Sequence, residues 1–376
     1  MDTGPNRIAI WAVTPNGVDL AAKLRKQWAG VVIYCSRRLV PTGGALEVQA
    51  CVKIFDGLIA VVQENFRRFD GHVFIMAAGI VVRAIGPLLR HKAVDPAVVV
   101  VDDQGKFAIS LLSGHIGGAN RLAARTAELL GAMPVITTAT DVNGRPAIDV
   151  LAVDLGLAIE NPAAVKGVNM ALLAGRPVAL WDPWGLVAPV LGADVQAVDL
   201  AVVAAFSPEQ PGVYADDRCA PLPEHVLRLR PPSLAAGIGC NRDTAAEEIA
   251  ALLKAALAEG GVSERSLWKI ASIDLKRDEP GLLALARTLG VPLHFYSAES
   301  LNQVRHVPNP SAMAAKHVGV HSVCEAAAIL AAQQGHLIVA KRKSANATVA
   351  IARRASLSSA SDRATTPTSP AGPGRC

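Results

Sequence analysis

Short apolar runs alternate along this chain with longer amphipathic segments, and this alternation constrains the fold more than any other feature. Ala97–Val101 is a continuous apolar run (AVVVV) that suits a strand buried on both faces. The runs Ile8–Val13 and Val73–Met76 also predict strands, whereas Val18–Trp28 and Arg121–Leu130 have the apolar spacing of helices. Strands that alternate with helices predict an α/β fold with mostly parallel sheets.

Breaks in this pattern predict three consecutive α/β domains and a tail. The first is expected to cover residues 1–140, and the second 141–231, where a stretch rich in Pro, Arg and Asp reads as a linker. The third is expected at 232–353. Residues 354–376 form a low-complexity Ser/Thr/Pro/Gly sequence, which we expect to be a disordered tail because it cannot bury enough surface to offset its ordering entropy.

Composition excludes several classes of protein. The formal net charge of +5 is spread over the chain and only 4% of residues are aromatic, so a nucleic-acid partner is disfavoured and an anionic small molecule is favoured. The most apolar long stretch, Leu186–Phe206, contains Pro and Asp residues that argue against a membrane span. The six cysteines are scattered and the start lacks the pattern of a signal peptide, so we expect a cytoplasmic protein. The sequence is also compatible with a homo-oligomer.

The motif SGHIGGAN, residues 113–120, is the densest candidate site. It lies between an expected strand (Lys106–Leu112) and an expected helix, where glycines expose backbone N–H groups and a helix N-terminus favours an anion or oxyanion. His115 adds a group that can move a proton near neutral pH. The alternative is a tight turn without a ligand.

Other strand ends carry weaker signals. We expect Gly79 and Arg83 to open a helix beside the same sheet edge as the 113–120 loop, where an arginine suits carboxylates, although a solvated helix arginine is an equal alternative. His91-Lys92 reads as a polar rim or an ordinary loop. Thr138 and Asp141 follow a strand on the same side, where they bind a ligand or cap the next element.

In the third segment, Gly239 and Arg242 also lie at a strand-to-helix turn, and Cys240 between them reads as structural rather than nucleophilic. Two capping boxes are predicted, Thr244 with Glu247 and Ser322 with Glu325.

No metal site is predicted. His317 and His321 have the i, i+4 spacing of helical ligands, but the residues between them read as a strand.

Longer motifs resemble a known family. The stretch with SGHIGGAN and PVITTATD resembles the N-terminal domain of the cobalt-precorrin-5A hydrolase (CbiG) family of anaerobic cobalamin biosynthesis. ENPAAVKGVNMALLAGRPV resembles its middle domain, and GIGCNRDTAAEEI, GVHSVCEAAAIL and KRKSANATVAIA resemble its C-terminal domain. The resemblance covers about Ile8 to Arg353 in family order.

The resemblance implies opening of the δ-lactone of cobalt-precorrin-5A with release of acetaldehyde, giving cobalt-precorrin-5B. The cobalt belongs to the substrate, so no cofactor is implied, and neighbouring pathway enzymes are conceivable partners. We assign His115 as general base and acid, and the backbone N–H groups of Gly117 and Gly118 as donors to the oxyanion. Ser113 either assists these donors or acts as a nucleophile; direct attack by water is preferred. The expected substrate-binding residues are Gly79, Arg83, Lys92, Gly114, Gly117, Gly118, Asn120, Thr138, Asp141, Gly239 and Arg242.

Two other functions compete with this hypothesis. A non-catalytic corrinoid-binding or carrier protein is one, because the C-terminal segment also resembles a small stand-alone protein of the aerobic pathway. Nucleotide binding ranks last, since neither GxGxxG with its acidic partner nor GxxxxGK[ST] occurs.

Overall fold

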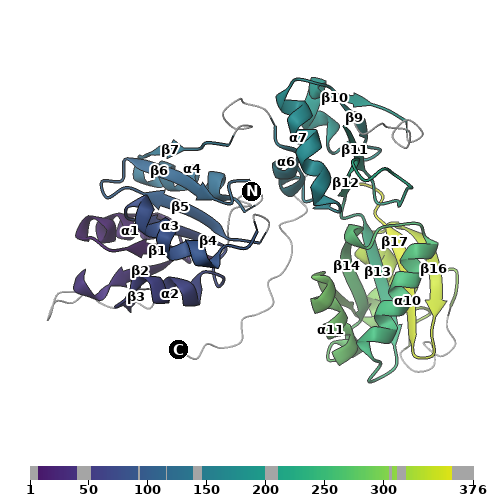
Figure 1. Cartoon of the computed structure of the whole chain (residues 1–376). Coiled ribbons are helices and arrows are strands. Elements are labelled where there is room, and N and C mark those ends of the chain that lie inside the picture. Colours follow the sequence, from purple (N-terminus) through teal and green to yellow (C-terminus); the bar gives the residue numbers. More distant parts are fainter. Residues whose placement is uncertain are drawn as a thin grey trace. The chain divides into compact units, whose positions relative to one another are not determined.

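A computed structural model describes residues 7–39, 52–91, 94–115, 117–138, 146–199, 211–304, 307–310 and 319–357. Within these ranges the strands form three sheets accompanied by helices (Figure 1). Most strand pairs are parallel, which confirms the predicted α/β class with mostly parallel sheets. The chain divides into two compact units, Met1–Val150 and Leu151–Cys376, so the second and third sheets belong to one unit. The division into three domains stays a prediction.

The first sheet has the strand order β3-β2-β1-β4-β5-β6-β7. Its strands are β1 (Ile8–Ala12), β2 (Val32–Ser36), β3 (Val52–Phe55), β4 (Gly71–Ile75), β5 (Ala97–Val101), β6 (Phe107–Leu112) and β7 (Met133–Val135). Its helices are α1 (Pro15–Gln27), α2 (Leu58–Asn65), α3 (Ala78–Ile85) and α4 (Ala119–Leu130). Helix α1 begins before the predicted Val18, because the Thr14 side chain accepts a hydrogen bond from the Gly17 N–H and caps it.

Helices cover both faces of this sheet. Helices α1 and α4 pack on one face through Leu24 and Leu122, and α2 and α3 pack on the other through Val62 and Val81. Every residue of β1, β4 and β5 is buried, which explains why these strands are continuously apolar in the sequence.

Strand β6 runs antiparallel to β5, and this reversal corrects one sequence-based prediction. Leu112 at the end of β6 pairs with Val98 near the beginning of β5, whereas Gly79 and Arg83 follow the end of β4. The 113–118 loop and Arg83 therefore lie at opposite ends of the strands of this sheet, whereas the sequence predicted that they lie at the same end. Strand β7 is parallel to β6, so Thr138 does lie at the loop's edge, as predicted.

The second and third sheets have the strand orders β10-β9-β11-β12-β8 and β15-β14-β13-β17-β16. The second contains β8 (Ala158–Ile159), β9 (Val178–Trp181), β10 (Val195–Ala197), β11 (Gly212–Ala215) and β12 (Leu227–Arg230), with α7 (Val165–Leu173) and α8 (Ala188–Leu191). Helix α6 (Ile148–Asp154) comes before β8, and the division between the two units falls within it. The third contains β13 (Leu234–Cys240), β14 (Leu267–Ile273), β15 (Leu293–Tyr296), β16 (His336–Lys343) and β17 (Ala347–Arg353), with α10 (Ala246–Glu259), α11 (Pro280–Leu289), α12 (Ala298–Asn302) and α14 (Cys324–Ala331).

Neither predicted capping box forms. The Thr244 hydroxyl donates to the Asn241 carbonyl, and Ala245 is the N-cap of α10. Helix α14 has Val323 as its N-cap, and the buried Glu325 carboxylate accepts hydrogen bonds from Asn309 and the Lys341 N–H. The Glu325 carboxylate therefore binds a neighbouring loop and strand and does not cap the N-terminus of its own helix.

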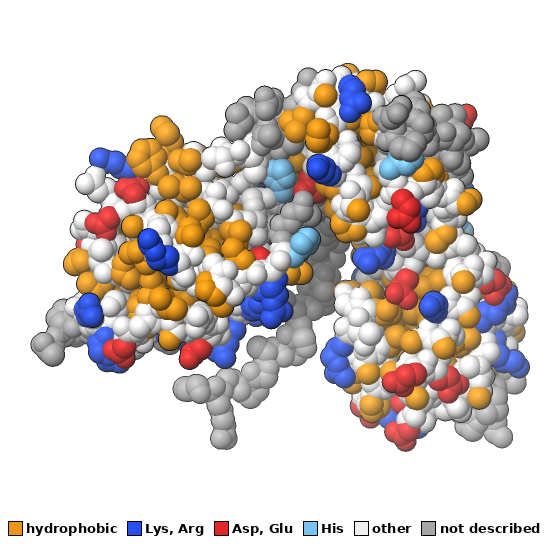
Figure 2. Space-filling view, in the orientation of Figure 1, with side chains coloured by type: hydrophobic (Ala, Val, Ile, Leu, Met, Phe, Trp, Pro, Cys, Tyr) orange, Lys and Arg blue, Asp and Glu red, His pale blue; other side chains and the backbone are white. Residues whose placement is uncertain are grey.

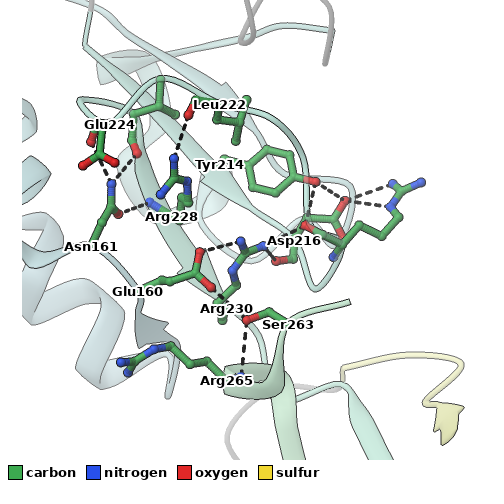
Figure 3. Close-up of polar contacts among 12 residues, drawn as sticks. Glu160, Asn161, Tyr214, Asp216, Leu222, Glu224, Arg228, Arg230, Ser263 and Arg265 are labelled. Carbon is green, nitrogen blue, oxygen red and sulfur yellow. Dashed lines mark hydrogen bonds and ion pairs between the residues drawn. The ribbon is translucent and has the colours of Figure 1, made fainter. Parts of the chain in front are cut away.

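A buried polar cluster joins the second and third sheets (Figure 3). The Arg230 guanidinium, 2% exposed, donates to the Glu160 carboxylate at 2.6 Å and to the carbonyls of Asp216 and Arg218. Ser263, which precedes β14, donates to the other oxygen of Glu160. Burial would raise the pKa of Glu160, but the hydrogen bond and charge of Arg230 outweigh it and hold this pKa below its usual range.

The ordered chain continues past the predicted domain end at Arg353. The Arg354 N–H donates to the Ser233 carbonyl, its guanidinium donates to Gln333, and it lies 4.3 Å from the centroid of the Trp268 ring. Arg354 is 5% exposed, so the predicted tail begins too early. The rest of that tail, 358–376, lies outside the described residues.

Apolar side chains gather on the face of the first unit that Figure 2 shows. Ile80 and Val82 of α3 are 43% and 51% exposed, on the helix that also carries Arg83. Within the described ranges, no helix is long and apolar enough to cross a membrane.

Candidate active site

The 113–118 loop connects β6 to α4 through three turn-like hydrogen bonds. The Ser113 and Gly114 carbonyls accept from the Ala119 and Asn120 N–H groups, and the His115 carbonyl accepts from the Gly118 N–H at 2.9 Å. The Gly118 N–H is therefore engaged within the loop. Among the described residues no partner is found for the Gly117 N–H. The oxyanion role of these two glycines stays a prediction.

Glycine is required at two positions of this loop. Gly118, the N-cap of α4, has φ of +86°, in the left-handed region that side chains disfavour. A Cβ on Gly117 would lie 2.3 Å from the Ser113 Cβ, closer than any two such atoms can approach. The pair of glycines thus reflects the tight closure of the loop as well as the exposure of its backbone.

Ser113 adopts a strained backbone conformation with φ of +60°. Its hydroxyl donates to the Asp95 carbonyl at 2.9 Å, which ties the loop to the segment before β5. The hydroxyl proton is therefore directed at a carbonyl oxygen rather than at an imidazole. A nucleophilic or oxyanion role for Ser113 stays a prediction.

His115 is mostly buried, and its ring lies against a carboxylate. The side chain is 21% exposed, and Nδ1 is 3.4 Å from Oδ2 of Asp149. Asp149 lies in the first turn of α6, within the first unit, and its side chain is 8% exposed. A carboxylate next to Nδ1 favours the tautomer that carries its proton on Nδ1.

Asn120 holds the loop rather than facing an open site. Its Oδ1 accepts from Ser110 of β6 at 2.7 Å, and its Nδ2 donates to the Thr138 hydroxyl at 2.9 Å. Asn120 is 8% exposed, and Gly114 packs against its side chain. These contacts join β6, α4 and the segment after β7, so the structure brings Gly114, Asn120 and Thr138 together.

The other predicted site residues lie elsewhere. The exposed Arg83 guanidinium donates to the Gly79 carbonyl at 3.1 Å, at the opposite edge of the first sheet. In the second unit, Gly239 packs against Thr348, and Arg242 binds Asp278 through one amino group at 2.9 and 3.0 Å. Lys92 and Asp141 lie outside the described residues. The substrate-binding roles of these residues stay predictions.

Cys240 is half-buried, and burial raises the pKa of its thiol to about 11. It is therefore protonated at neutral pH, which fits the prediction that it is not a nucleophile.

Two further features of the described residues bear on the choice of site. No cluster of three His, Cys, Asp or Glu side chains is found there, and His317 lies outside these ranges. A cavity of about 530 Å³ against the third sheet is lined by residues such as Val304, Ile329 and Leu337 and contains none of the predicted site residues.

Comparison with known proteins covers most of the chain. Family models match residues 60–141 ("Cobalamin synthesis G N-terminal"), 146–231 ("Cobalamin biosynthesis central region") and 234–352 ("Cobalamin synthesis G C-terminus"). A cobalt-precorrin-5A hydrolase of Salmonella typhimurium is 37% identical over 333 residues, which are 88% of this chain and 93% of that protein. The chain belongs to the CbiG family. A second hydrolase of that name, from Priestia megaterium, is 33% identical over 92% of this chain and 94% of its own length.

About a third of this CbiG chain also matches a shorter protein. Protein CobE of Sinorhizobium sp is 42% identical over 126 residues, which are 33% of this chain and 82% of that protein.

Sequence reasoning missed Asp149. The available signal was an acidic residue in the first turn of an expected helix, where the helix dipole favours a negative charge. Nothing local links that carboxylate to a histidine 34 positions earlier, so only the fold shows the pair.

Proposed function

We propose that this protein is a cobalt-precorrin-5A hydrolase, which opens the δ-lactone of its substrate and releases acetaldehyde to give cobalt-precorrin-5B. Two hydrolases of that name match almost the whole chain. The observation that carries the site is the position of His115, next to a carboxylate and in a loop whose Gly117 N–H has no partner among the described residues.

In the first step, His115 acts as general base through Nε2. It removes a proton from water while the water oxygen bonds to the lactone carbonyl carbon, and the Gly117 N–H donates to the resulting oxyanion. The tetrahedral intermediate then breaks the bond to the ring oxygen of the lactone, and protonated His115 returns the proton to that oxygen. The products are a carboxylate and an alcohol.

In the second step, the freed alcohol leaves as acetaldehyde. Its hydroxyl loses a proton, the adjacent carbon–carbon bond breaks as the carbonyl forms, and the macrocycle takes up the electron pair and a proton. His115 is again placed as the proton carrier. Direct attack by water is preferred over a covalent Ser113 ester, because the Ser113 hydroxyl donates to the Asp95 carbonyl.

The cobalt enters with the substrate, so the proposal requires no resident cofactor. The macrocycle carries several carboxylates, and a chain with a net charge of +5 favours such a polyanion. Cys35, Cys219, Cys240 and Cys324 are free thiols, which supports the reducing cytoplasm as the site of the reaction.

The test is anaerobic incubation of the purified protein with cobalt-precorrin-5A, with acetaldehyde trapped and the mass of the macrocycle followed. Acetaldehyde with a matching two-carbon loss is the expected result. Binding without a mass change, when a relative of established activity converts the same substrate, would replace this function with that of a carrier.

The first variant to measure is His115→Ala. We expect turnover to fall by about 100-fold or more, because general acid–base groups contribute about 10² to 10⁴ in rate. The matched control is His336→Ala, since His336 is an exposed histidine at the start of β16. If His115→Ala and His336→Ala released acetaldehyde at the same rate, His115 would not be the proton carrier.

A further inference from the structure

The contact between His115 and Asp149 is separate from the hydrogen bonds that close the loop. The loop closes through backbone hydrogen bonds, through Ser113 and through Asn120, as described above. The Asp149 carboxylate instead approaches a ring nitrogen of the one histidine in the loop, at 3.4 Å.

The position of Asp149 suits a charged partner for the imidazole. It lies in the first turn of α6, and the partial positive charge of a helix N-terminus stabilises a carboxylate. Its side chain is 8% exposed, so little water screens its interaction with the ring. A distance of 3.4 Å is long for a hydrogen bond, but such contacts between catalytic groups often shorten when substrate binds.

We infer that Asp149 is a positioning residue for His115: its carboxylate accepts a hydrogen bond from Nδ1–H and so favours the tautomer in which Nε2 is unprotonated and can act as the base. This inference rests on the proposed function of the loop. In the reaction, Nε2 takes the proton from water, and the imidazolium that forms is stabilised by the carboxylate until the proton passes to the leaving oxygen. Asp149 itself stays unprotonated and does not touch the substrate.

The tautomer of His115 can be measured without substrate. In protein labelled with ¹⁵N histidine at about pH 8, where imidazoles are mostly neutral, two-bond ¹H–¹⁵N spectra distinguish protonated Nδ1 from protonated Nε2. The His115 signals are assigned by their loss in His115→Ala. We expect protonated Nδ1 in the unaltered protein and a mixture of tautomers in Asp149→Ala. A dominant Nε2–H tautomer in the unaltered protein would overturn the inference.

Kinetics then separate positioning from a structural role. We expect Asp149→Ala to lower kcat by about 100-fold with KM changed by less than about threefold, and Asp149→Glu to restore part of kcat. In the His115→Ala background, Asp149→Ala should have no further effect, because it acts only through the imidazole. The control is Asp19→Ala, an exposed acidic residue of α1.

Each result has a distinct meaning. If the unaltered protein releases no acetaldehyde, the proposed function fails, while the tautomer measurement still decides whether Asp149 orients the ring. If it is active and Asp149→Ala keeps its kcat, or if the two alanine substitutions multiply, Asp149 does not position His115. If Asp149→Ala does not fold, the size-conserving Asp149→Asn takes its place, and full kcat in that variant contradicts the inference.

Discussion

At the scale of single residues, the first sheet contains a buried histidine whose two hydrogen bonds require a neutral ring. His72 is fully buried; its Nδ1 accepts from the Trp11 indole at 3.1 Å and its Nε2 donates to the Phe66 carbonyl at 2.9 Å. These two bonds require one proton on the ring. Burial lowers the pKa of His72 to about 4, against an opposing effect of the Phe66 carbonyl.

This pKa predicts how stability depends on pH. Between pH 6.5 and about 4 the unfolded state binds a proton at His72 and the folded state does not, so the free energy of unfolding falls as pH falls through this window. The full difference is about 3 kcal/mol, and it levels off below the folded-state pKa. Urea unfolding followed by tryptophan fluorescence at several pH values should show this loss in the unaltered protein.

The variant His72→Gln keeps a donor for the Phe66 carbonyl but cannot take up the proton. Its stability should depend less on pH by about 3 kcal/mol over the same window. If the free energy of unfolding depended on pH in the same way in both proteins, protonation of His72 would not be the cause of the pH dependence.

At the scale of elements, local patterns predicted what local contacts decide. The valine run became β5, and Gly131 ends α4 in the left-handed conformation expected of a C-terminal glycine. The direction of β6 was not predictable in this way, because its apolar pattern fits a parallel or an antiparallel partner equally well. That direction separates Arg83 from the 113–118 loop.

The predicted side-chain caps of helices were wrong because tertiary contacts, too, decide which partner a capping side chain binds. Asn161 precedes Pro162 as an N-cap should, yet its amide binds the backbone of Glu224, Val226 and Arg228 in a distant segment. A side chain that can satisfy either a local or a distant partner is placed by the tertiary fold. The SGHIGGAN loop was recognisable because its tight closure is itself local.

The closure of that loop predicts the effect of a single methyl group. Gly117→Ala brings a Cβ to 2.3 Å from the Ser113 Cβ, so the loop must move. We expect turnover to fall by about 100-fold, since small displacements of a catalytic group cost about that much. The control is Gly86→Ala, where no atom lies within 4 Å of the added Cβ and φ is −48°. Equal turnover in both variants would show that the loop's geometry does not matter for the reaction.

The end of β17 gives a second prediction at this scale. A chain ending at Arg353 loses the contacts of Arg354 with Ser233, Gln333 and Trp268, and we expect it to be less stable by about 1–3 kcal/mol. A chain that ends after residue 357 keeps them and should match the full-length protein. Thermal unfolding of the three proteins shows whether Arg354 contributes to stability. Identical melting temperatures would contradict this role.

At the scale of the whole molecule, the second and third sheets belong to one compact unit, so they should unfold together. Asp217, after β11, is fully buried and accepts two hydrogen bonds from Arg353 of β17, at 2.8 and 2.9 Å. The backbone carbonyl of Asp217 also accepts a hydrogen bond from the N–H of Ser263, which precedes β14 of the third sheet. The carboxylate and backbone of one residue thus hold both sheets.

Removing this carboxylate leaves the Arg353 guanidinium, 21% exposed, without its ion-pair partner. We expect Asp217→Ala to cost about 3–5 kcal/mol, as for other broken buried ion pairs. A unit that unfolds cooperatively should show hydrogen exchange accelerated by the same factor in the slowest amides of β11 and of β13. The control is Asp278→Asn, which breaks an exposed pair with Arg242 and should leave stability almost unchanged, because solvent screens such a pair. Acceleration confined to one sheet would mean that the two sheets fold as separate domains joined by a polar interface.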